Sequence, residues 1–154
     1  MYDTNHLGHH LRSASVGRDE TLYAEMLDGR TLSYGEMFSA AEKNAAALQK
    51  VGLSPGDCVA AQLEKSIESI QLYLGTILAG GVFLPLNTAY TPSELEYFLA
   101  DAKPFIFVCD PETAPTLEGL AAQAGVSKVL TLSSDGTGTL MEALPTHTEN
   151  FKEV

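Results

Sequence analysis

Four short runs of apolar residues dominate the pattern of hydrophobic and polar positions along the chain. They cover residues 58–63, 82–86, 105–109 and 128–132. Short apolar runs without strict alternation are typical of strands that are buried on both faces, as in a parallel sheet. We therefore expect these runs to form a mostly parallel sheet.

Helical patterns precede the first run and separate all four. In each predicted helix, apolar residues recur every third or fourth position and so line one face. The predicted faces are Phe38, Ala41, Ala45 and Leu48; Ile67, Ile70, Leu74 and Ile77; Leu95, Phe98, Leu99 and Ala102; and Leu117, Leu120 and Ala124. Alternating strands and helices imply right-handed crossovers. The predicted fold class is therefore α/β, with a mostly parallel, doubly wound sheet and flanking helices.

Capping residues mark where two of these helices begin. Ser33 and Glu36 have the spacing of a capping box, in which each side chain accepts a hydrogen bond from the other residue's backbone. Thr91 and Glu94 have the same spacing, and proline occupies the first helical position between them. Both helices are therefore predicted to start at these residues.

Turn signals divide the rest of the chain. Asp28-Gly29 is typical of a hairpin turn between two strand-like segments, and Gly52 suits the left-handed position after a helix. Residues 54–57 (Ser-Pro-Gly-Asp) predict a further turn. A polar loop over residues 133–139 precedes a single predicted helical turn over residues 139–144, with a cap of its own.

Three regions follow from these signals. Residues 1–20 are expected to be an N-terminal helix or arm, and residues 21–144 an α/β subdomain. Residues 145–154 are expected to be a frayed tail. The chain has 154 residues, of which 45% are hydrophobic and 19% are charged, which is enough for one domain with a core.

Charge and hydropathy exclude several classes of function. Twenty acidic and nine basic residues give a formal net charge of −11, which disfavours nucleic acids and anionic membranes as partners. No apolar run is long enough for a membrane span, and the N-terminus lacks an apolar signal core. Cys58 and Cys109 both lie in apolar runs, so we expect reduced, buried thiols and a cytoplasmic location.

Few residues have the spacing of a reaction centre. His6 and His10 stand four positions apart with His9 beside them, but no third metal ligand is close in sequence, so we expect solvated histidines and no metal. Residues 134–138 (Ser-Asp-Gly-Thr-Gly) lack the lysine of a phosphate loop and predict a surface turn. Gly80-Gly81 lacks the third glycine of a dinucleotide fingerprint.

Three loops are the expected location of any ligand site. They are residues 64–66 (Glu-Lys-Ser), 87–90 (from Asn87 to Tyr90) and 110–112 (Asp-Pro-Glu), and each follows the carboxyl end of a predicted strand. Ligands of open α/β sheets gather at that edge. The other interpretation is that these are ordinary strand–helix connections.

Several segments in order resemble the first subdomain of the adenylate-forming enzymes, which include acyl-CoA synthetases, luciferases and peptide-synthetase adenylation domains. These segments are residues 29–36 (Gly-Arg-Thr-Leu-Ser-Tyr-Gly-Glu), 52–60, 78–86 (Leu-Ala-Gly-Gly-Val-Phe-Leu-Pro-Leu) and 90–95 (Tyr-Thr-Pro-Ser-Glu-Leu). The resemblance covers roughly residues 22–132. Within the family, residues 62–66 and 85–91 look most like malonyl-CoA synthetases.

The resemblance implies a two-step reaction of the full-length protein, in which a carboxylic acid and Mg-ATP give an acyl-adenylate and CoA then displaces AMP. ATP, Mg²⁺ and CoA are therefore implied for the parent, with malonate or another small acid as substrate. The family's glycine-rich, lysine-bearing phosphate loop does not occur in this sequence. No catalytic, cofactor-binding or metal-binding residue is therefore assigned, and we expect this chain alone, as an N-terminal fragment, to be inactive.

Two alternatives remain open at this point. The chain could be a non-catalytic α/β module that binds a ligand or a protein, or the start of an adenylation domain that loads a carrier protein. The coding sequence downstream of Val154 would discriminate among them. As part of a larger protein, the chain is expected to pack against the remainder of its parent. Alone, it is expected to expose apolar surface and to self-associate.

Overall fold

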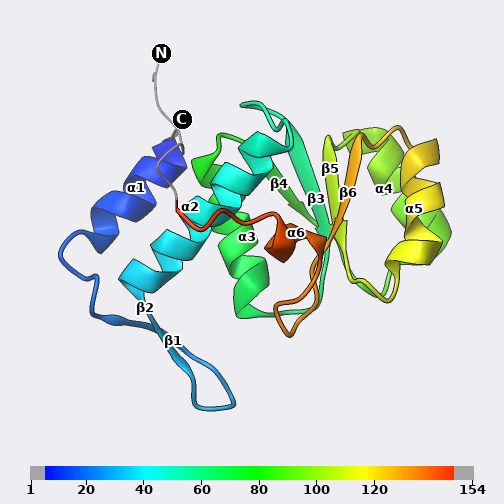
Figure 1. Ribbon diagram of the computed structural model, residues 1–154. Helices are drawn as coiled ribbons and strands as arrows, with labels where there is room; N and C mark the ends of the chain where they lie inside the picture. Colours follow the sequence, from blue (N-terminus) through cyan, green and yellow to red (C-terminus); the bar gives the residue numbers. More distant parts are fainter. Residues whose placement is uncertain (1–5, 148–154) are drawn as a thin grey trace.

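Four parallel strands form the central sheet of the computed structural model, which describes residues 6–147 except for the side chain of His6 (Figure 1). The strands are β3 (Cys58–Gln62), β4 (Val82–Pro85), β5 (Ile106–Cys109) and β6 (Lys128–Thr131). They are ordered β4-β3-β5-β6, and every pairing between them is parallel. The predicted parallel sheet is confirmed, with each strand within one residue of the predicted run at either end.

Helices cover both faces of this sheet (Figure 1). One layer holds α2 (Tyr34–Lys50) and α3 (Ile67–Leu78), with α1 (His6–Ser15) against α3 and the short α6 (Thr139–Glu142) beside α2. The other layer holds α4 (Pro92–Ala102) and α5 (Ala114–Gln123). The chain moves from β3 outward to β4 and then back across β3 to β5, so the helices change face and the sheet is doubly wound.

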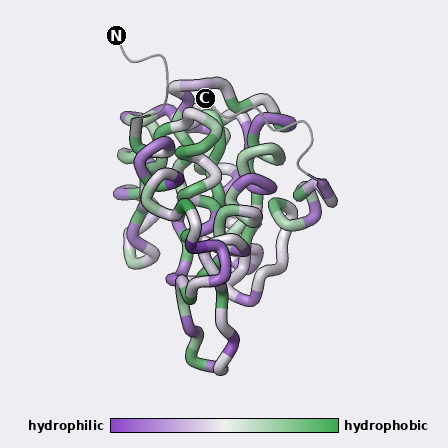
Figure 2. Tube along the Cα trace, turned by 90° about the vertical axis from the view of Figure 1, so that its left-hand side faces the viewer, coloured by the Kyte–Doolittle hydropathy of each residue, from purple (hydrophilic) through white to green (hydrophobic). Residues whose placement is uncertain are grey.

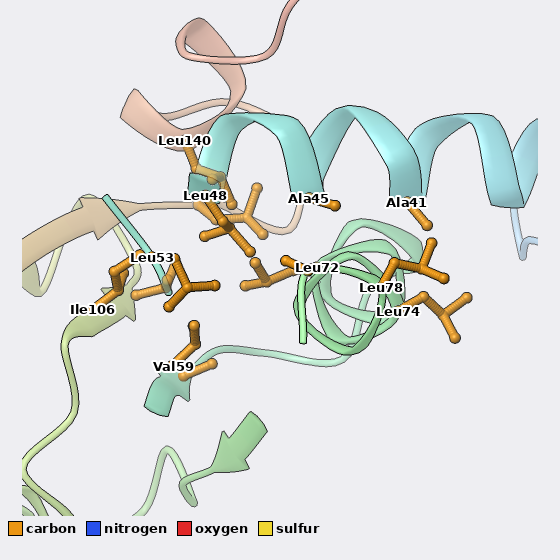
Figure 3. Packing of buried hydrophobic residues seen from close by; sticks show 14 of the residues in the cluster. Ala41, Ala45, Leu48, Leu53, Val59, Leu72, Leu74, Leu78, Ile106 and Leu140 are labelled. Carbon is orange, nitrogen blue, oxygen red and sulfur yellow. The ribbon is translucent and has the colours of Figure 1, made fainter. Parts of the chain in front are cut away.

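Two hydrophobic clusters fill the space between the layers. The first joins α2 and α3 to the sheet and includes Met37, Leu48, Leu72 and Val59, all fully buried. Figure 3 shows Leu48, Leu72 and Val59 pointing into the same space. The second lies under α4 and α5 around Phe107 of β5. The central strands are thus buried from both sides, as the apolar runs predicted.

The two outer strands differ from that prediction. β5 is buried along its whole length, but Val82 of β4 is 55% exposed and Lys128 of β6 is also exposed. An edge strand has a neighbour on one side only, and the helical layers do not extend fully over it. The expectation that all four runs are buried on both faces was therefore wrong for β4 and β6.

The buried face of α3 was also predicted incorrectly. Leu74 of the predicted face is buried, but Ile70 is 41% exposed, and the buried face instead includes Leu72, Gly75 and Leu78. The buried face also carries the polar residues Gln71 and Thr76, so apolar periodicity favours a different face of α3 from the one that is buried. Close contact with α2 makes the choice, and this contact is centred on a residue without a side chain, Gly75.

Both predicted capping boxes are confirmed. In α2, Ser33 Oγ accepts from the Glu36 amide at 3.2 Å and the Glu36 carboxylate accepts from the Ser33 amide at 2.8 Å. The box at the start of α4 is formed in the same way by Thr91 and Glu94. A third box, between Ser66 and Ser69 at the start of α3, was not predicted.

A hairpin of β1 (Leu22–Glu25) and β2 (Thr31–Ser33) extends away from the main sheet (Figures 1 and 2). The predicted turn at Gly29 is present, with a φ of +84°, and Gly52 adopts the predicted left-handed conformation after α2, with a φ of +107°. The turn over residues 54–57 is also present, closed by a hydrogen bond from the Asp57 amide to the Ser54 carbonyl at 3.0 Å.

The start of α6 differs from the expected cap. Gly138 occupies the N-cap position, and no side chain caps the helix. The hydroxyl that follows, on Thr139, instead accepts a hydrogen bond from the Thr131 amide at 2.9 Å and so closes the loop after β6. Leu140 then enters the first hydrophobic cluster.

Candidate functional site

A pocket of about 650 Å³ lies at the carboxyl ends of β3 and β4. We call it the β3–β4 pocket. It is lined by residues of β3 and the following loop (Ala61, Leu63, Glu64, Lys65), of α3 (Ser69, Ile70, Tyr73), and of β4 and the loop after it (Phe83, Pro85, Leu86, Asn87, Thr88, Tyr90). Its position at the carboxyl edge of a parallel sheet is where ligands of open α/β folds bind.

Aromatic rings form much of the wall. Tyr73 of α3 and Phe83 of β4 meet edge to face, with ring centroids 5.4 Å apart. Tyr90 stacks on Phe98 of α4 at 4.9 Å with an interplanar angle of 23°. These contacts hold the rings in place, because aromatic pairs at such separations attract one another beyond simple burial.

The loop of residues 87–90, the 87–90 loop, has a defined backbone. Asn87 Oδ1 accepts from the Ala89 amide at 2.9 Å, and the Asn87 carbonyl accepts from the Tyr90 amide at 3.1 Å. Gln62, the last residue of β3, donates from Nε2 to the same carbonyl at 2.9 Å. The loop is therefore a closed turn tied to the neighbouring strand.

Polar groups lie at the mouth of the pocket. Glu64 and Lys65 are exposed in the loop after β3, and Lys65 is the only cation among the lining residues. Ser69 is already engaged, since its hydroxyl donates to the Ser66 carbonyl at 2.8 Å. The pocket thus combines apolar walls with one positive charge and the exposed side chains of Asn87 and Thr88.

The structure brings together two of the three predicted loops. Residues 64–65 and the 87–90 loop share the β3–β4 pocket, whereas residues 110–112 do not line it. Asp110 instead organises the turn that leads into α5: its side chain accepts from the Glu112 amide at 2.8 Å and its carbonyl accepts from the Ala114 amide at 3.0 Å. For this third loop, an ordinary strand–helix connection describes the structure.

A second groove of similar volume, about 670 Å³, lies between α2, α3 and α6. Its lining includes Asp19, Glu36, Lys43 and Gln71. Glu36 is already held in its capping box, and none of the three loops predicted to hold a ligand reaches this groove. The β3–β4 pocket is therefore the candidate site.

The remaining candidates of the sequence lie elsewhere. His9 and His10 are exposed on α1, and within residues 6–147 no three His, Cys, Asp or Glu side chains come together as a metal site. The side chain of His6 lies outside the described residues. Residues 133–138 form a turn in which Asp135 Oδ1 accepts from the Thr137 amide at 3.0 Å and from its hydroxyl at 2.7 Å.

The two thiols are unreactive by environment. Burial, together with the nearby negative charges of Glu118 and Asp110, raises the pKa of Cys109 to about 11. Cys58 is only partly buried, so the expectation of a buried thiol was wrong at this position; its partial burial still raises its pKa. Because the thiolate is the nucleophilic form, neither residue has the character of a catalytic cysteine.

Sequence reasoning missed Gln62, Tyr73 and Phe83 as parts of this region. Gln62 carried a signal, since it is a polar residue at the end of an otherwise apolar strand run. Tyr73 and Phe83 carried no such signal. In the sequence they look like any other apolar residue of a helix and a strand, and only the fold brings them together.

Comparisons with known proteins show the family of the chain and relatives of its fold. A sequence profile of the family described as AMP-binding enzyme matches residues 11–153. The ATP-bound crystal structure of MatB from Rhodopseudomonas palustris is 42% identical over 98% of this chain and 30% of its own, with a TM-score of 0.90. Acyl-CoA ligase azaF of Aspergillus niger is 32% identical over 111 residues, which is 71% of this chain and 21% of that protein.

A peptide synthetase is also among the relatives. A linear gramicidin synthase of Brevibacillus parabrevis is 30% identical over 122 residues, which cover 79% of this chain and 2% of that protein. The chain thus spans less than a third of each of these relatives. In residues 6–147, every helix is too short or too polar to cross a bilayer.

Proposed function

The chain belongs to the AMP-binding enzyme family, and on that premise we propose that it is the N-terminal part of an ATP-dependent acid–CoA ligase. The observation that carries the proposal is the likeness to MatB over nearly the whole chain, in both sequence and fold. The likeness to an acyl-CoA ligase of Aspergillus niger supports the same reaction class. Two free thiols, of which Cys109 is buried and Cys58 partly buried, fit a reducing, cytoplasmic location.

The proposed reaction has two steps. A carboxylate oxygen of the acid attacks the α-phosphorus of Mg-ATP, and pyrophosphate leaves. The thiol of CoA then attacks the carbonyl carbon of the acyl-adenylate, and AMP leaves. Negative charge that develops on phosphate oxygens in the first step requires amides, a lysine or a metal aimed at them.

In our proposal, this chain does not supply the amides, lysine or metal that the first step requires. Residues 6–147 hold no carboxylate cluster that would fit Mg²⁺, and the sequence holds no glycine-rich loop with a lysine. Removing one pre-organised donor commonly costs a factor of about a hundred or more in kcat. We therefore propose that the 154 residues alone have no ligase activity.

We propose that the β3–β4 pocket receives part of CoA. The long arm of CoA carries amides and methylene groups, which suit a pocket of aromatic walls with Asn87 and Thr88 at its mouth. Lys65 supplies a positive charge for a phosphate of CoA in a chain that is otherwise strongly acidic. For the acid, we propose malonate, from the resemblance of residues 62–66 and 85–91 to malonyl-CoA synthetases.

Pyrophosphate exchange tests the proposal. The full-length parent and this chain are each assayed with malonate, acetate and a medium-chain acid. We expect ATP–pyrophosphate exchange by the parent, fastest with malonate, and none by this chain. A parent inert toward every acid would reject the ligase and favour a non-catalytic module, whereas exchange by this chain would reveal a reaction centre of its own.

A carrier protein is the second candidate acceptor. The likeness to a linear gramicidin synthase favours this candidate. The two are distinguished by the second step: the parent is supplied with its acyl-adenylate and either CoA or a carrier domain with a pantetheine arm. Thioester formed on the carrier, with CoA left unused, would replace the proposed acceptor.

A further inference from the structure

We infer that Gln62 is a positioning residue that holds the 87–90 loop against the sheet and thereby sets the affinity of the β3–β4 pocket for CoA. The inference rests on the proposed function, because that function names CoA as the ligand of this pocket. Gln62 itself does not line the pocket.

Gln62 contacts the loop from the far side of the sheet. Side chains alternate along a strand, and Ala60, two residues earlier, belongs to the cluster under α4 and α5. Gln62 therefore faces that layer, whereas Ala61 and Leu63 face the pocket. The residue is 8% exposed, so almost all of it is removed from water.

One hydrogen bond carries the connection. Gln62 Nε2 donates to the Asn87 carbonyl at 2.9 Å, across 25 positions of sequence. The bonds of Asn87 with Ala89 and Tyr90 give the loop its shape but remain inside it. The bond from Gln62 adds a link to β3, one residue beyond the last β3–β4 backbone contact, in which the Leu86 amide donates to the Ala61 carbonyl at 2.8 Å.

Packing alone does not explain a glutamine here. A buried amide loses its hydrogen bonds to water, and an apolar side chain of similar volume fills such a site without that cost. The amide is useful because it gives a carbonyl at the start of the loop a second donor. The carbonyl belongs to Asn87, which lines the pocket together with the next residue, Thr88, so the position of this carbonyl sets the position of the mouth.

The substitution Gln62→Met isolates this role. Methionine keeps the length of the side chain and removes the donor. Gln71→Met is the matched control, since Gln71 is also a buried glutamine, at 9% exposed, but lies on α3 outside the β3–β4 pocket. Both variants are made in the full-length parent, and their melting temperatures establish that they are folded.

Three measurements separate positioning from a general loss of structure. The first is ATP–pyrophosphate exchange without CoA, which reports adenylate formation. The second is the KM for CoA in thioester formation. The third is hydrogen exchange at the Ala89 and Tyr90 amides, which reports the loop directly and needs no activity.

For Gln62→Met we expect exchange of pyrophosphate within twofold of the parent and faster hydrogen exchange in the loop. The KM for CoA should rise about fivefold or more, the factor that corresponds to one ordinary hydrogen bond. Gln71→Met should leave the KM for CoA and the loop amides unchanged.

Three results would overturn the inference. One is an equal loss in both steps, which would make Gln62 a purely structural residue. Another is an unchanged KM for CoA together with unchanged loop amides. In the third, the loop amides of Gln62→Met exchange faster, but the parent catalyses no pyrophosphate exchange at all. The failure then lies in the proposed function, and CoA is not the ligand.

Discussion

Gly75→Ala tests the close contact of α2 and α3 on which the first hydrophobic cluster is built. A Cβ at position 75 would lie 2.5 Å from Asn44 Cβ, 2.8 Å from the Ala41 carbonyl oxygen and 3.0 Å from the Ala45 nitrogen. Two of these three atoms belong to the backbone of α2, so rotation of a side chain does not relieve the contact. The two helices must instead move apart.

Two opposing effects set the size of the change. Alanine gains about 1 kcal/mol over glycine in a helix interior. Overpacking of a tight contact costs about 1–3 kcal/mol, and backbone neighbours favour the upper end of that range. We expect a net loss of about 2 kcal/mol in the free energy of unfolding, which corresponds to about 4–8 °C in melting temperature for a chain of this size.

Gly119→Ala in α5 is the control. Apart from its chain neighbours and the backbone of its own helix, no atom lies within 4 Å of a Cβ built at Gly119, and its backbone does not have a positive φ. This substitution should therefore raise stability by roughly 0.5–1 kcal/mol through helix propensity alone. Urea and thermal unfolding of both variants give the comparison. Equal stabilisation by the two substitutions would refute the argument from close contact.

Three further predictions concern ionisation, metal binding and association. Hydrogen bonds from the Thr91 hydroxyl and amide lower the pKa of Glu94, so its ionised form stabilises the fold above the ordinary glutamate pKa, and this contribution is lost as the pH falls through the lowered value. Glu94→Gln keeps the capping box but does not titrate, so melting curves of the two proteins should differ at neutral pH and converge in acid; a constant difference at every pH would contradict this linkage. The chain should carry no stoichiometric zinc at His6, His9 or His10 after purification without chelators, and elemental analysis that finds one zinc per chain would overturn this expectation. Leu27 is fully exposed at the hairpin and Val82 is 55% exposed, so the isolated chain should self-associate at high concentration in sedimentation velocity. Leu27→Asp should reduce that association. A strictly monomeric chain would count against an apolar contact surface.

Features that depend on residues close in sequence were determined by the sequence itself. The capping boxes at Ser33 and Thr91 join groups three positions apart, and the positive φ of Gly52 follows from the end of one helix. The four strands were predicted for a related reason, because each apolar run already marks a segment that must leave water. The alternation of strands and helices then restricts the connections to right-handed crossovers.

The tertiary structure decided which of these elements meet. Strand order made β4 and β6 the edges, and contact at Gly75 chose a buried face of α3 that includes the polar residues Gln71 and Thr76. The tertiary structure also separated residues 110–112 from the β3–β4 pocket. It placed the Gln62 side chain against the Asn87 carbonyl, 25 residues away in sequence. Such choices depend on packing between segments that are distant in sequence. The periodicity of hydrophobic and polar residues indicates which side of a segment avoids water, but not which other segment that side packs against.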